Sequence, residues 1–518
     1  MAKNKKSAKK PPQKKSRPIL SGILMGLICL LLLIAYLCLF ATIWYVDVYG
    51  RIGFDSVLYT LFSGTDGVQS GLISDYLTHG ALPAVLCWTG TLLLLFFPLK
   101  RVWKAKLFSK ERQLFPIPPK IAKIIGLVLS LILMIYAAWN VELIDYISAQ
   151  IQGTELYQRD YRDPGEVSIT FPEEKRNLIY IILESMETTY LSTEEGGALS
   201  HNLIPELYDL AQNNINFSHN NTVGGFQQIT GASWTVGSLV AQTGGIPLKV
   251  PDGILDQQNG YGQNGEFLPG LTTLQSILQD NGYYQAMMFG SDARYAGRKT
   301  YFTTHGVDRI YDLYTARADG LIAEDYRVWW GYEDKYLFSY AKQVLTEMAA
   351  LDQPFAFTML TADTHHVGGY PCSLCDRKYI ENYDNVIACS SAQTAAFIRW
   401  LSQQPFYDNT TIVIVGDHNS MDANYFKRQV DENYQRHIYN CFINSAVSAV
   451  NTTNRQFTAM DLFPTTLAAM GCTIEGDRLG LGVNLFSNLP TLLERYGYES
   501  FSEELARRTF YYNRFYEE

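Results

Sequence analysis

Residues 177–190 read NLIYIILESMETTY. The run Leu178–Leu183 is apolar throughout, and Glu184 and Ser185 follow it directly. A short apolar run bounded by polar residues is typical of a strand that is buried on both faces of its sheet. The stretch therefore predicts a buried strand with a carboxylate at its carboxyl end.

The same pattern recurs further along the chain. Three more apolar runs suit buried strands: Tyr284–Phe289, Phe355–Leu360 and Thr411–Val415. Segments with a helical pattern accompany them at residues 271–278, 393–401 and 459–470. Strands that alternate with helices predict an α/β domain with a mostly parallel sheet, covered by helices on both faces.

Acidic and histidine side chains follow the predicted strands. Ligands of such sheets bind at the carboxyl ends of the strands. Glu184 follows the first run, and Asp417 and His418 follow the last. Any one of these residues could be an ordinary loop residue, but together they predict a site. Two carboxylates and an imidazole suit Mn²⁺, Zn²⁺ or Mg²⁺. His365 and His366, after the third run, are further candidates for metal or phosphate contacts.

Residues 224–247 read GGFQQITGASWTVGSLVAQTGGIP, a loop that runs into a short helical stretch. Thr235 is expected near the start of this helix, where exposed N–H groups and the helix dipole favour negative charge. A hydroxyl there, beside a divalent metal, could be deprotonated and attack phosphorus. The alternative is that Thr235 or Ser233 simply caps the helix, and the local sequence alone favours this alternative.

Four segments in this order resemble a known family. They are residues 177–190, SWTVGSLVAQTGGIP at 233–247, TADTHH at 361–366 and VGDHN at 415–419. This set resembles the lipoteichoic acid synthase and phosphoglycerol transferase family, within the alkaline phosphatase and sulfatase superfamily. The resemblance covers residues 120–490, and apolar stretches before the catalytic domain also agree with it.

The resemblance implies a role for each candidate residue. Thr235 matches the catalytic threonine, which forms a phosphoglycerol-threonine intermediate. Glu184, Asp417 and His418 match the metal ligands, with Thr235 completing the set around Mn²⁺, or Zn²⁺ or Mg²⁺. His365 and Arg298 match contacts to the phosphate or glycerol. The implied donor is phosphatidylglycerol, and the implied acceptor is an extracellular polymer of the lipoteichoic acid type or a glycan.

Three other functions stay open. A phosphoethanolamine transferase of the same superfamily would use a different lipid donor. A phosphodiesterase would transfer only to water, and a non-catalytic membrane sensor could keep the fold. Sulfate-ester hydrolysis is disfavoured, because the sequence has no Cys/Ser-x-Pro-x-Arg motif at the corresponding place.

Three stretches near the N-terminus contain no charged residue: Ile19–Val46, Gly80–Leu99 and Ile124–Val141. About 20 apolar residues cross the hydrocarbon core of a membrane, so these stretches predict three transmembrane helices. The first could instead be a signal peptide, although its apolar run is long for one. The segment Ile52–Gly64 is short and contains Asp55, so it is not counted.

The distribution of charge predicts the orientation of these helices. Residues 1–17 and 100–123 are rich in Lys and Arg, and basic loops stay in the cytoplasm. Three crossings then place the rest of the chain outside, in a multi-pass membrane protein with an extracellular or periplasmic catalytic domain. The whole chain has a net charge of −9, and the outer part is acidic. A nucleic-acid partner is therefore not expected.

These patterns divide the chain into five parts. We expect a basic cytoplasmic tail at residues 1–17, a transmembrane region at 18–145, a connector at 146–175, the catalytic domain at 176–490 and a C-terminal tail at 491–518.

Five cysteines fall in the predicted outer part: Cys372, Cys375, Cys389, Cys441 and Cys472. The first two form a Cys-x-x-Cys pair, which predicts a disulfide in an outside compartment, with a redox or zinc motif as the alternative. A zinc ribbon would need a second such pair, which the sequence does not contain. The sequence fixes neither the pairing nor the oligomeric state.

Overall fold

The computed structural model describes residues 18–51, 53–62, 70–96, 103–107, 110–115, 117–249 and 265–517. The predicted basic tail at 1–17 lies outside these ranges. The chain forms two compact units. One comprises Met1–Tyr45 with Gly71–Asn140, and the other comprises Val46–Ser70 with Val141–Glu518.

The first unit is built on apolar helices. Three segments are long and apolar enough to cross a membrane: Ser21–Tyr49, Ile73–Phe96 and Pro119–Asn140. They agree with the three predicted stretches. The first segment lies within α1 (Pro18–Tyr49), and the third is α5 (Pro119–Asn140). The second comprises most of α3 (Ser70–Tyr76), the π-helical turn η1 (Leu77–Ala81) and α4 (Leu82–Phe96). The strands β1 (Trp103–Leu107) and β2 (Lys110–Phe115) pair between α4 and α5.

A glycine lets two of these helices approach closely. A Cβ atom on Gly126 of α5 would lie 2.8 Å from Cγ2 of Ile28 on α1. Small residues at such positions are how helices pack in a membrane, where water supplies no hydrophobic driving force between them.

The second unit contains a seven-stranded sheet in the order β5-β10-β9-β4-β8-β6-β7. Its parallel strands are β4 (Asn177–Leu183), β6 (Tyr284–Phe289), β7 (Arg309–Tyr311), β8 (Phe355–Leu360) and β9 (Thr410–Gly416). All four predicted strands are present, and the mostly parallel sheet is confirmed. At one edge, β10 (Ile438–Ile443) and β5 (Gly225–Phe226) run antiparallel to their neighbours.

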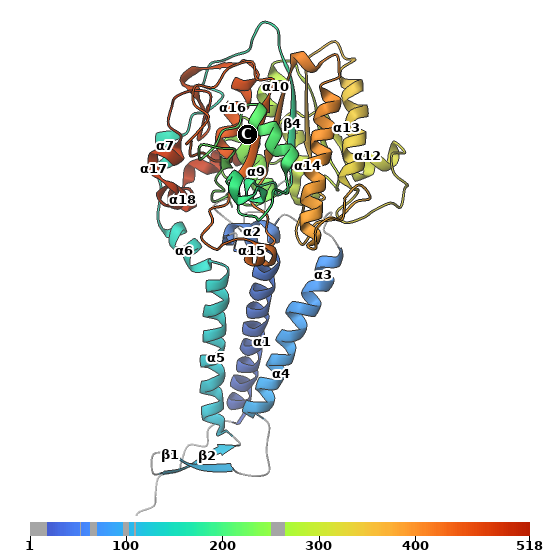
Figure 1. Ribbon diagram of the computed structural model, residues 1–518. Helices are drawn as coiled ribbons and strands as arrows, with labels where there is room; N and C mark the ends of the chain where they lie inside the picture. Colours follow the sequence, from blue (N-terminus) through green and yellow to red (C-terminus); the bar gives the residue numbers. More distant parts are fainter. Residues whose placement is uncertain are drawn as a thin grey trace, which may run out of the picture. The chain divides into compact units, whose positions relative to one another are not determined.

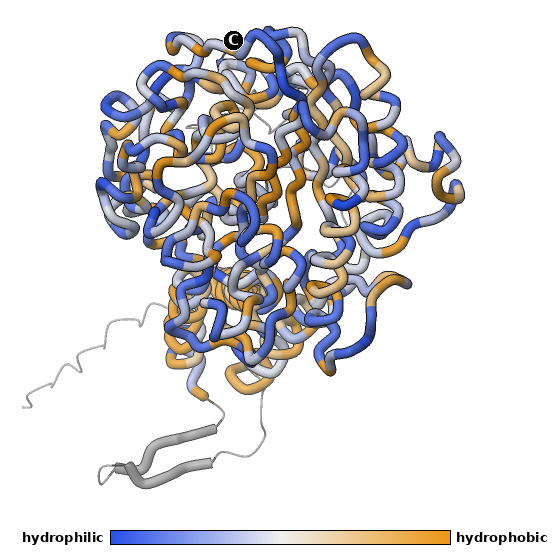
Figure 2. The backbone as a smooth tube through the Cα atoms, turned by 45° about the horizontal axis from the view of Figure 1, so that its top comes forward, coloured by the Kyte–Doolittle hydropathy of each residue, from blue (hydrophilic) through white to orange (hydrophobic). Residues whose placement is uncertain are grey.

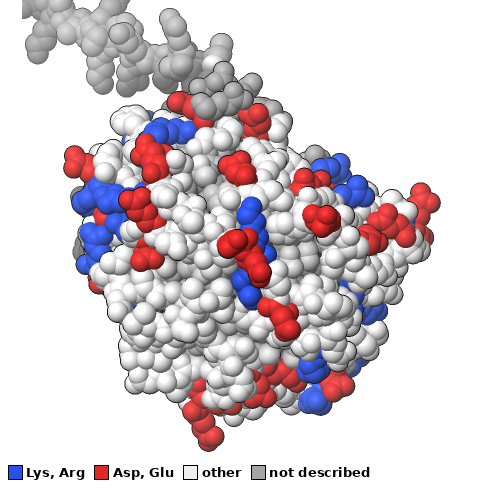
Figure 3. Space-filling model, turned by 90° about the horizontal axis from the view of Figure 1, so that it is seen from above, with Lys and Arg blue, Asp and Glu red and all other residues white. Residues whose placement is uncertain are grey.

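Helices cover both faces of this sheet, as predicted (Figure 1). The alternating side chains of β4 divide between two cores. Tyr180 and Ile182 pack on one side with α9 (Thr235–Gly244), α10 (Leu274–Asp280) and α16 (Leu462–Ala469). Ile179 and Ile181 pack on the other side with α8 (Pro205–Asn213), α13 (Asp334–Met348) and α14 (Asn382–Leu401). Figure 2 shows the resulting hydrophobic centre, and Figure 3 shows acidic and basic side chains interspersed on one outer face.

Segments before and after the sheet complete the second unit. They are α2 (Phe54–Phe62), α6 (Leu143–Ile151), α7 (Leu156–Asp160), β3 (Ile169–Thr170), α17 (Leu492–Tyr496), α18 (Tyr498–Ala506) and the 3₁₀ helix η9 (Phe510–Tyr516). Tyr157 of α7 is buried against Tyr512 and Phe515 of η9. The chain on both sides of the sheet thus contributes to one core.

The remaining short elements lie in the loops. They are α11 (Arg298–Thr304), α12 (Leu313–Ala318), α15 (Ala423–Gln429), β11 (Thr473–Ile474), β12 (Arg478–Leu479) and β13 (Gly482–Val483).

Candidate metal and nucleophile site

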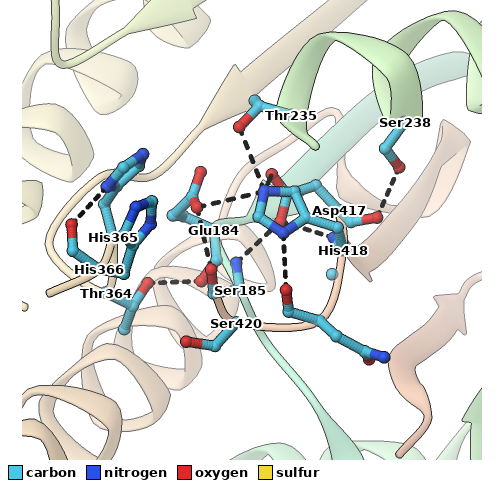
Figure 4. A network of polar contacts seen from close by, with 12 residues as sticks. Glu184, Ser185, Thr235, Ser238, Thr364, His365, His366, Asp417, His418 and Ser420 are labelled. Atoms are coloured by element: carbon cyan, nitrogen blue, oxygen red, sulfur yellow. Dashed lines mark hydrogen bonds and ion pairs between the residues drawn. The ribbon is translucent and has the colours of Figure 1, made fainter. Parts of the chain in front are cut away.

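Glu184, Asp417 and His418 meet at the carboxyl ends of two adjacent strands. β4 and β9 pair in parallel with Leu183 opposite Gly416, so the next residue of each strand enters the same space. One ligand atom from each of the three residues lies within 4.8 Å of the others. Nε2 of His418 is 3.6 Å from Oε1 of Glu184 and 3.3 Å from Oδ2 of Asp417. The predicted cluster is therefore present (Figure 4).

The two carboxylates of this cluster are buried. Burial, followed by the nearby charge of Asp417, raises the pKa of Glu184 well above its usual value. Oδ1 of Asp417 accepts hydrogen bonds from the backbone N–H groups of Ser185 and His418, both at 2.8 Å. Its Oδ2 has no hydrogen-bond partner among the described residues. An unsatisfied buried carboxylate oxygen is costly, and a divalent cation would satisfy it. The residues therefore fit a metal.

The ring of His418 is oriented as a ligand. Its Nδ1 lies 2.8 Å from the carbonyl oxygen of Asn419, so Nδ1 carries the proton and donates. The lone pair of Nε2 then faces Glu184 and Asp417. Metal-binding histidines are commonly fixed in this way by a backbone carbonyl.

Thr235 lies beside the cluster as the first residue of α9. The N-cap position belongs to Trp234, so the alternative in which Thr235 caps this helix is wrong. Oγ1 of Thr235 is 3.3 Å from Nε2 of His418. The hydroxyl of Thr235 thus lies both beside the candidate metal-binding cluster and at the positive end of the helix dipole.

A chain of buried polar groups holds α9 against the two strands. The hydroxyl of Ser238 donates to the carbonyl oxygen of Asp417 at 2.5 Å. The amide nitrogen of Gln242 donates to Ser238 and to the carbonyl oxygen of Gly416, and its amide oxygen accepts from Tyr180 on β4. This chain fixes the position of the nucleophile candidate relative to the carboxylates.

Arg298 and His365 line a small cavity of about 40 Å³ together with Glu184 and Thr235. Its other lining side chains that bear on recognition are Ser291, Tyr295 and Trp330. Both predicted substrate contacts therefore lie on the cavity that also exposes the nucleophile candidate.

Arg298 is buried but has no carboxylate partner in the described part of the chain. Its guanidinium donates to Oγ of Ser291 at 3.0 Å and to the carbonyl oxygen of Asp292 at 2.7 Å. Burial lowers its pKa, but an arginine remains charged. A buried cation held only by neutral acceptors favours an anion in the adjoining cavity.

His365 is neutral at physiological pH, because burial lowers its pKa to about 4. Its Nδ1 lies 2.8 Å from the carbonyl oxygen of His366, and its ring packs against Trp330 with a centroid separation of 4.7 Å. His366 is buried with Nδ1 lacking a hydrogen-bond partner among the described residues, and its ring faces Tyr49. The two histidines thus have different surroundings, and only His365 lines the cavity.

Several positioning residues escaped the sequence analysis. The hydroxyl of Thr364 donates to the carbonyl oxygen of Glu184 at 2.5 Å, and Oγ1 of Thr361 accepts from its N–H at 2.9 Å. The hydroxyl of Ser185 donates to Oε1 of Glu184. Both threonines belong to the TADTHH segment directly after β8. Their position at the end of a strand is the feature of the sequence from which their role could have been predicted.

Comparisons with known proteins agree with this architecture. The family model described as sulfatase matches residues 176–472. Phosphoglycerol transferase I of Escherichia coli is 31% identical over 302 residues, which are 55% of this chain and 37% of that protein. The protein of the same name from Shigella boydii matches to the same extent. The chain thus spans little more than a third of the length of these relatives.

Solved structures with low sequence identity are also similar. The lipoteichoic acid synthase LtaP from Listeria monocytogenes is 19% identical, with a TM-score of 0.48 over 62% of this chain and 79% of that one. The lipooligosaccharide phosphoethanolamine transferase A from Neisseria meningitidis is 15% identical, with a TM-score of 0.47 over 86% and 84%. Because the sulfatase model matches more than half of the chain, this protein belongs to the sulfatase family.

Proposed function

We propose that this protein is a metal-dependent phosphoglycerol transferase that uses Thr235 as its nucleophile. The observation that carries the proposal is the position of Oγ1 of Thr235. It lies at a helix N-terminus, 3.3 Å from a ligand atom of a buried carboxylate–imidazole cluster, on a cavity lined by the buried cation Arg298. The identity to phosphoglycerol transferase I supports the choice of group transferred.

Glu184, Asp417 and His418, with Thr235, would hold the metal, and Mn²⁺ is the ion we assign. When bound, a divalent ion lowers the pKa of the Thr235 hydroxyl and offsets the negative charge on the phosphoryl oxygens. The N-terminus of α9 favours the same negative charge. The guanidinium of Arg298 binds a phosphoryl oxygen, and neutral His365 contacts the phosphate or the glycerol.

The reaction has two steps. In the first, a bond forms between Oγ1 of Thr235 and phosphorus, and the bond from phosphorus to the diacylglycerol oxygen breaks. The proton lost by the threonine is balanced by the proton gained by diacylglycerol. In the second, a bond forms between the oxygen of an acceptor hydroxyl and phosphorus, and the bond from phosphorus to Oγ1 of Thr235 breaks. The proton lost by the acceptor is balanced by the proton regained by the threonine, and the phosphoglycerol remains on the acceptor. The donor is phosphatidylglycerol, and the acceptor is a polymer of the lipoteichoic acid type or a glycan.

The test uses the full chain in lipid nanodiscs with Mn²⁺ and fluorescent phosphatidylglycerol, and it measures diacylglycerol release. Thr235→Ala should lower the rate by about a thousandfold or more, as removal of a covalent nucleophile does. Thr230→Ala is the matched control, because Thr230 lies in the same segment but bonds to Ser502. Mass spectrometry of the wild-type protein without acceptor should find phosphoglycerol on Thr235. Full activity of Thr235→Ala would refute the nucleophile.

The lipid donor separates the rival functions. Release of diacylglycerol from phosphatidylethanolamine instead of phosphatidylglycerol would identify a phosphoethanolamine transferase. Release from neither lipid, with Mn²⁺ bound, would identify a sensor. Release of free glycerol phosphate in the presence of glycan acceptors would identify a phosphodiesterase.

We also place the catalytic unit outside the cell, in a multi-pass protein of the cell membrane. The basic segments at 1–17 and 100–123 support this orientation, because basic loops stay in the cytoplasm. Protease added to intact cells should cleave the chain after residue 141 and spare the 100–123 segment. Cleavage within residues 100–123 would show that the orientation is the reverse of the one we propose.

A further inference from the structure

Three cysteines form a compact group away from the proposed catalytic cluster. Cys372 and Cys375 lie in the loop between β8 and α14, and Cys389 lies on α14. Sγ of Cys372 is 3.8 Å from Sγ of Cys375 and 3.9 Å from Sγ of Cys389. All three sulfurs lie within 4.8 Å of one another, and none is in a disulfide.

These separations match metal coordination. The sulfurs of a disulfide are about 2.05 Å apart. A tetrahedral zinc ion with Zn–S bonds of about 2.3 Å holds neighbouring sulfurs about 3.8 Å apart. Cys372 is close to this separation from both of its partners. The sequence alone does not show that Cys389 lies beside the Cys-x-x-Cys pair. In the structure it adds a third sulfur to the two sulfurs of that pair.

Hydrogen-bond donors point at the sulfurs. The N–H of Leu374 donates to Sγ of Cys372 at 3.4 Å. The side-chain amide of Gln393, one turn after Cys389 on α14, donates to Sγ of Cys389 at 3.3 Å and to Sγ of Cys372 at 3.8 Å. Such donors stabilise thiolates and orient metal-bound sulfur.

A positive side chain lies against the same loop. Nζ of Lys335, at the start of α13, donates to Oγ of Ser373 at 3.1 Å, between the two cysteines of the loop. The same ammonium group pairs with Oε1 of Glu333 at 3.1 Å, and this pair holds it at the edge of the loop.

We propose that Cys372, Cys375 and Cys389 bind a zinc ion that fastens the β8–α14 loop to α14. A water molecule would complete the tetrahedron, since the cluster contains no fourth His, Cys, Asp or Glu among the described residues. The loop begins with the segment that carries His365. The ion would therefore fix one wall of the catalytic cavity without contacting substrate. Its sulfur ligands distinguish it from the oxygen and nitrogen cluster around Asp417.

Cobalt substitution tests the site on the full chain. The protein is stripped of metal under reducing conditions and loaded with Co²⁺. Thiolate–cobalt charge transfer absorbs in the near ultraviolet, and the cluster of Glu184, Asp417 and His418 has no sulfur that could produce it. We expect this band in the wild type and in Asp417→Asn, and its loss in Cys389→Ser. Cys472→Ala, which removes a buried cysteine outside the group, should keep the band.

Metal content and thiol counting complete the test. As isolated, the wild type should contain about one equivalent of zinc more than Cys375→Ser, which changes the least buried of the three ligands and so keeps the fold intact. After denaturation without reductant, all three thiols should react. A folded wild-type protein with no charge-transfer band would overturn the proposal. So would a disulfide that leaves only one of the three thiols reactive. Failure of phosphoglycerol transfer would leave these readouts unchanged.

Discussion

Replacement of Gln242 by leucine should destabilise the catalytic unit and displace the nucleophile. Gln242 is fully buried, and its side chain makes three hydrogen bonds at 2.9, 3.0 and 3.1 Å. Leucine fills a similar volume but leaves Tyr180, Ser238 and the carbonyl of Gly416 without this partner. At about 1 kcal/mol for each bond, the loss is about 3 kcal/mol.

This loss can be converted into a melting temperature. Unfolding entropy is about 2.1 cal/mol/K per residue, so a unit of roughly 400 residues should melt about 3.5 °C lower in the variant. The assay is thermal unfolding of the full chain, followed by tryptophan fluorescence at a fixed heating rate. The rate of diacylglycerol release should fall as well, because the same side chain positions α9 against β9.

A matched control and a double variant sharpen the test. Gln212 bonds to the hydroxyl of Tyr208 on the surface of α8, so Gln212→Leu should change the free energy of unfolding by less than about 0.5 kcal/mol. Tyr180→Phe combined with Gln242→Leu should cost less than the sum of the two single changes. If Gln242→Leu melts within 1 °C of the wild type, the hydrogen bonds of Gln242 do not hold α9 against the strands, and the reasoning is refuted.

Three other predictions concern charge. Burial lowers the pKa of His305 to about 4, so the folded state favours the neutral ring. The neutral ring of His305 therefore contributes its full stability above pH 6.5. This contribution to the free energy of unfolding is lost as the pH falls towards 4. Between pH 7 and pH 4 the wild type should lose about 3 kcal/mol more stability than His305→Gln in urea titrations. Arg436→Met should lower the free energy of unfolding by about 3 kcal/mol, because it leaves buried Glu187 without its ion-pair partner. The second change Glu187→Gln in the same chain should recover part of this loss. Mn²⁺ at 100 times its dissociation constant should stabilise the wild type by about 2.7 kcal/mol and leave Asp417→Asn unaffected, as calorimetry would show.

The buried strands were predictable because their periodicity is simple. The sheet interior excludes water from both faces of β4, so Leu178–Leu183 contains no charged residue and only one polar group, the hydroxyl of Tyr180. The parallel register then brings Glu184 and Asp417 together without further information. This is why the core of the candidate site followed from sequence order alone.

Other features depend on contacts that no local pattern encodes. Strand β10, second from the edge of the sheet, contains Asn440, whose side chain bonds to the backbone of Phe217 far away in sequence. Helix α14 begins at Asn382, well before the predicted residue 393, because its first half is buried against α8 and the sheet. Cys389 joins the other two cysteines only once this helix has packed.

The segment Val46–Ser70 belongs to the catalytic unit although transmembrane stretches flank it in the sequence. Tyr59 of α2 packs on Trp234, next to the nucleophile, and its hydroxyl donates to the carbonyl of Ala296, close to Arg298. A fragment that begins after the last apolar helix would lack this segment. Trp234 and the carbonyl of Ala296 would then lose their contacts with Tyr59. The unit that contains the candidate site is therefore discontinuous in sequence, and any exchange of the apolar helices must keep this insert.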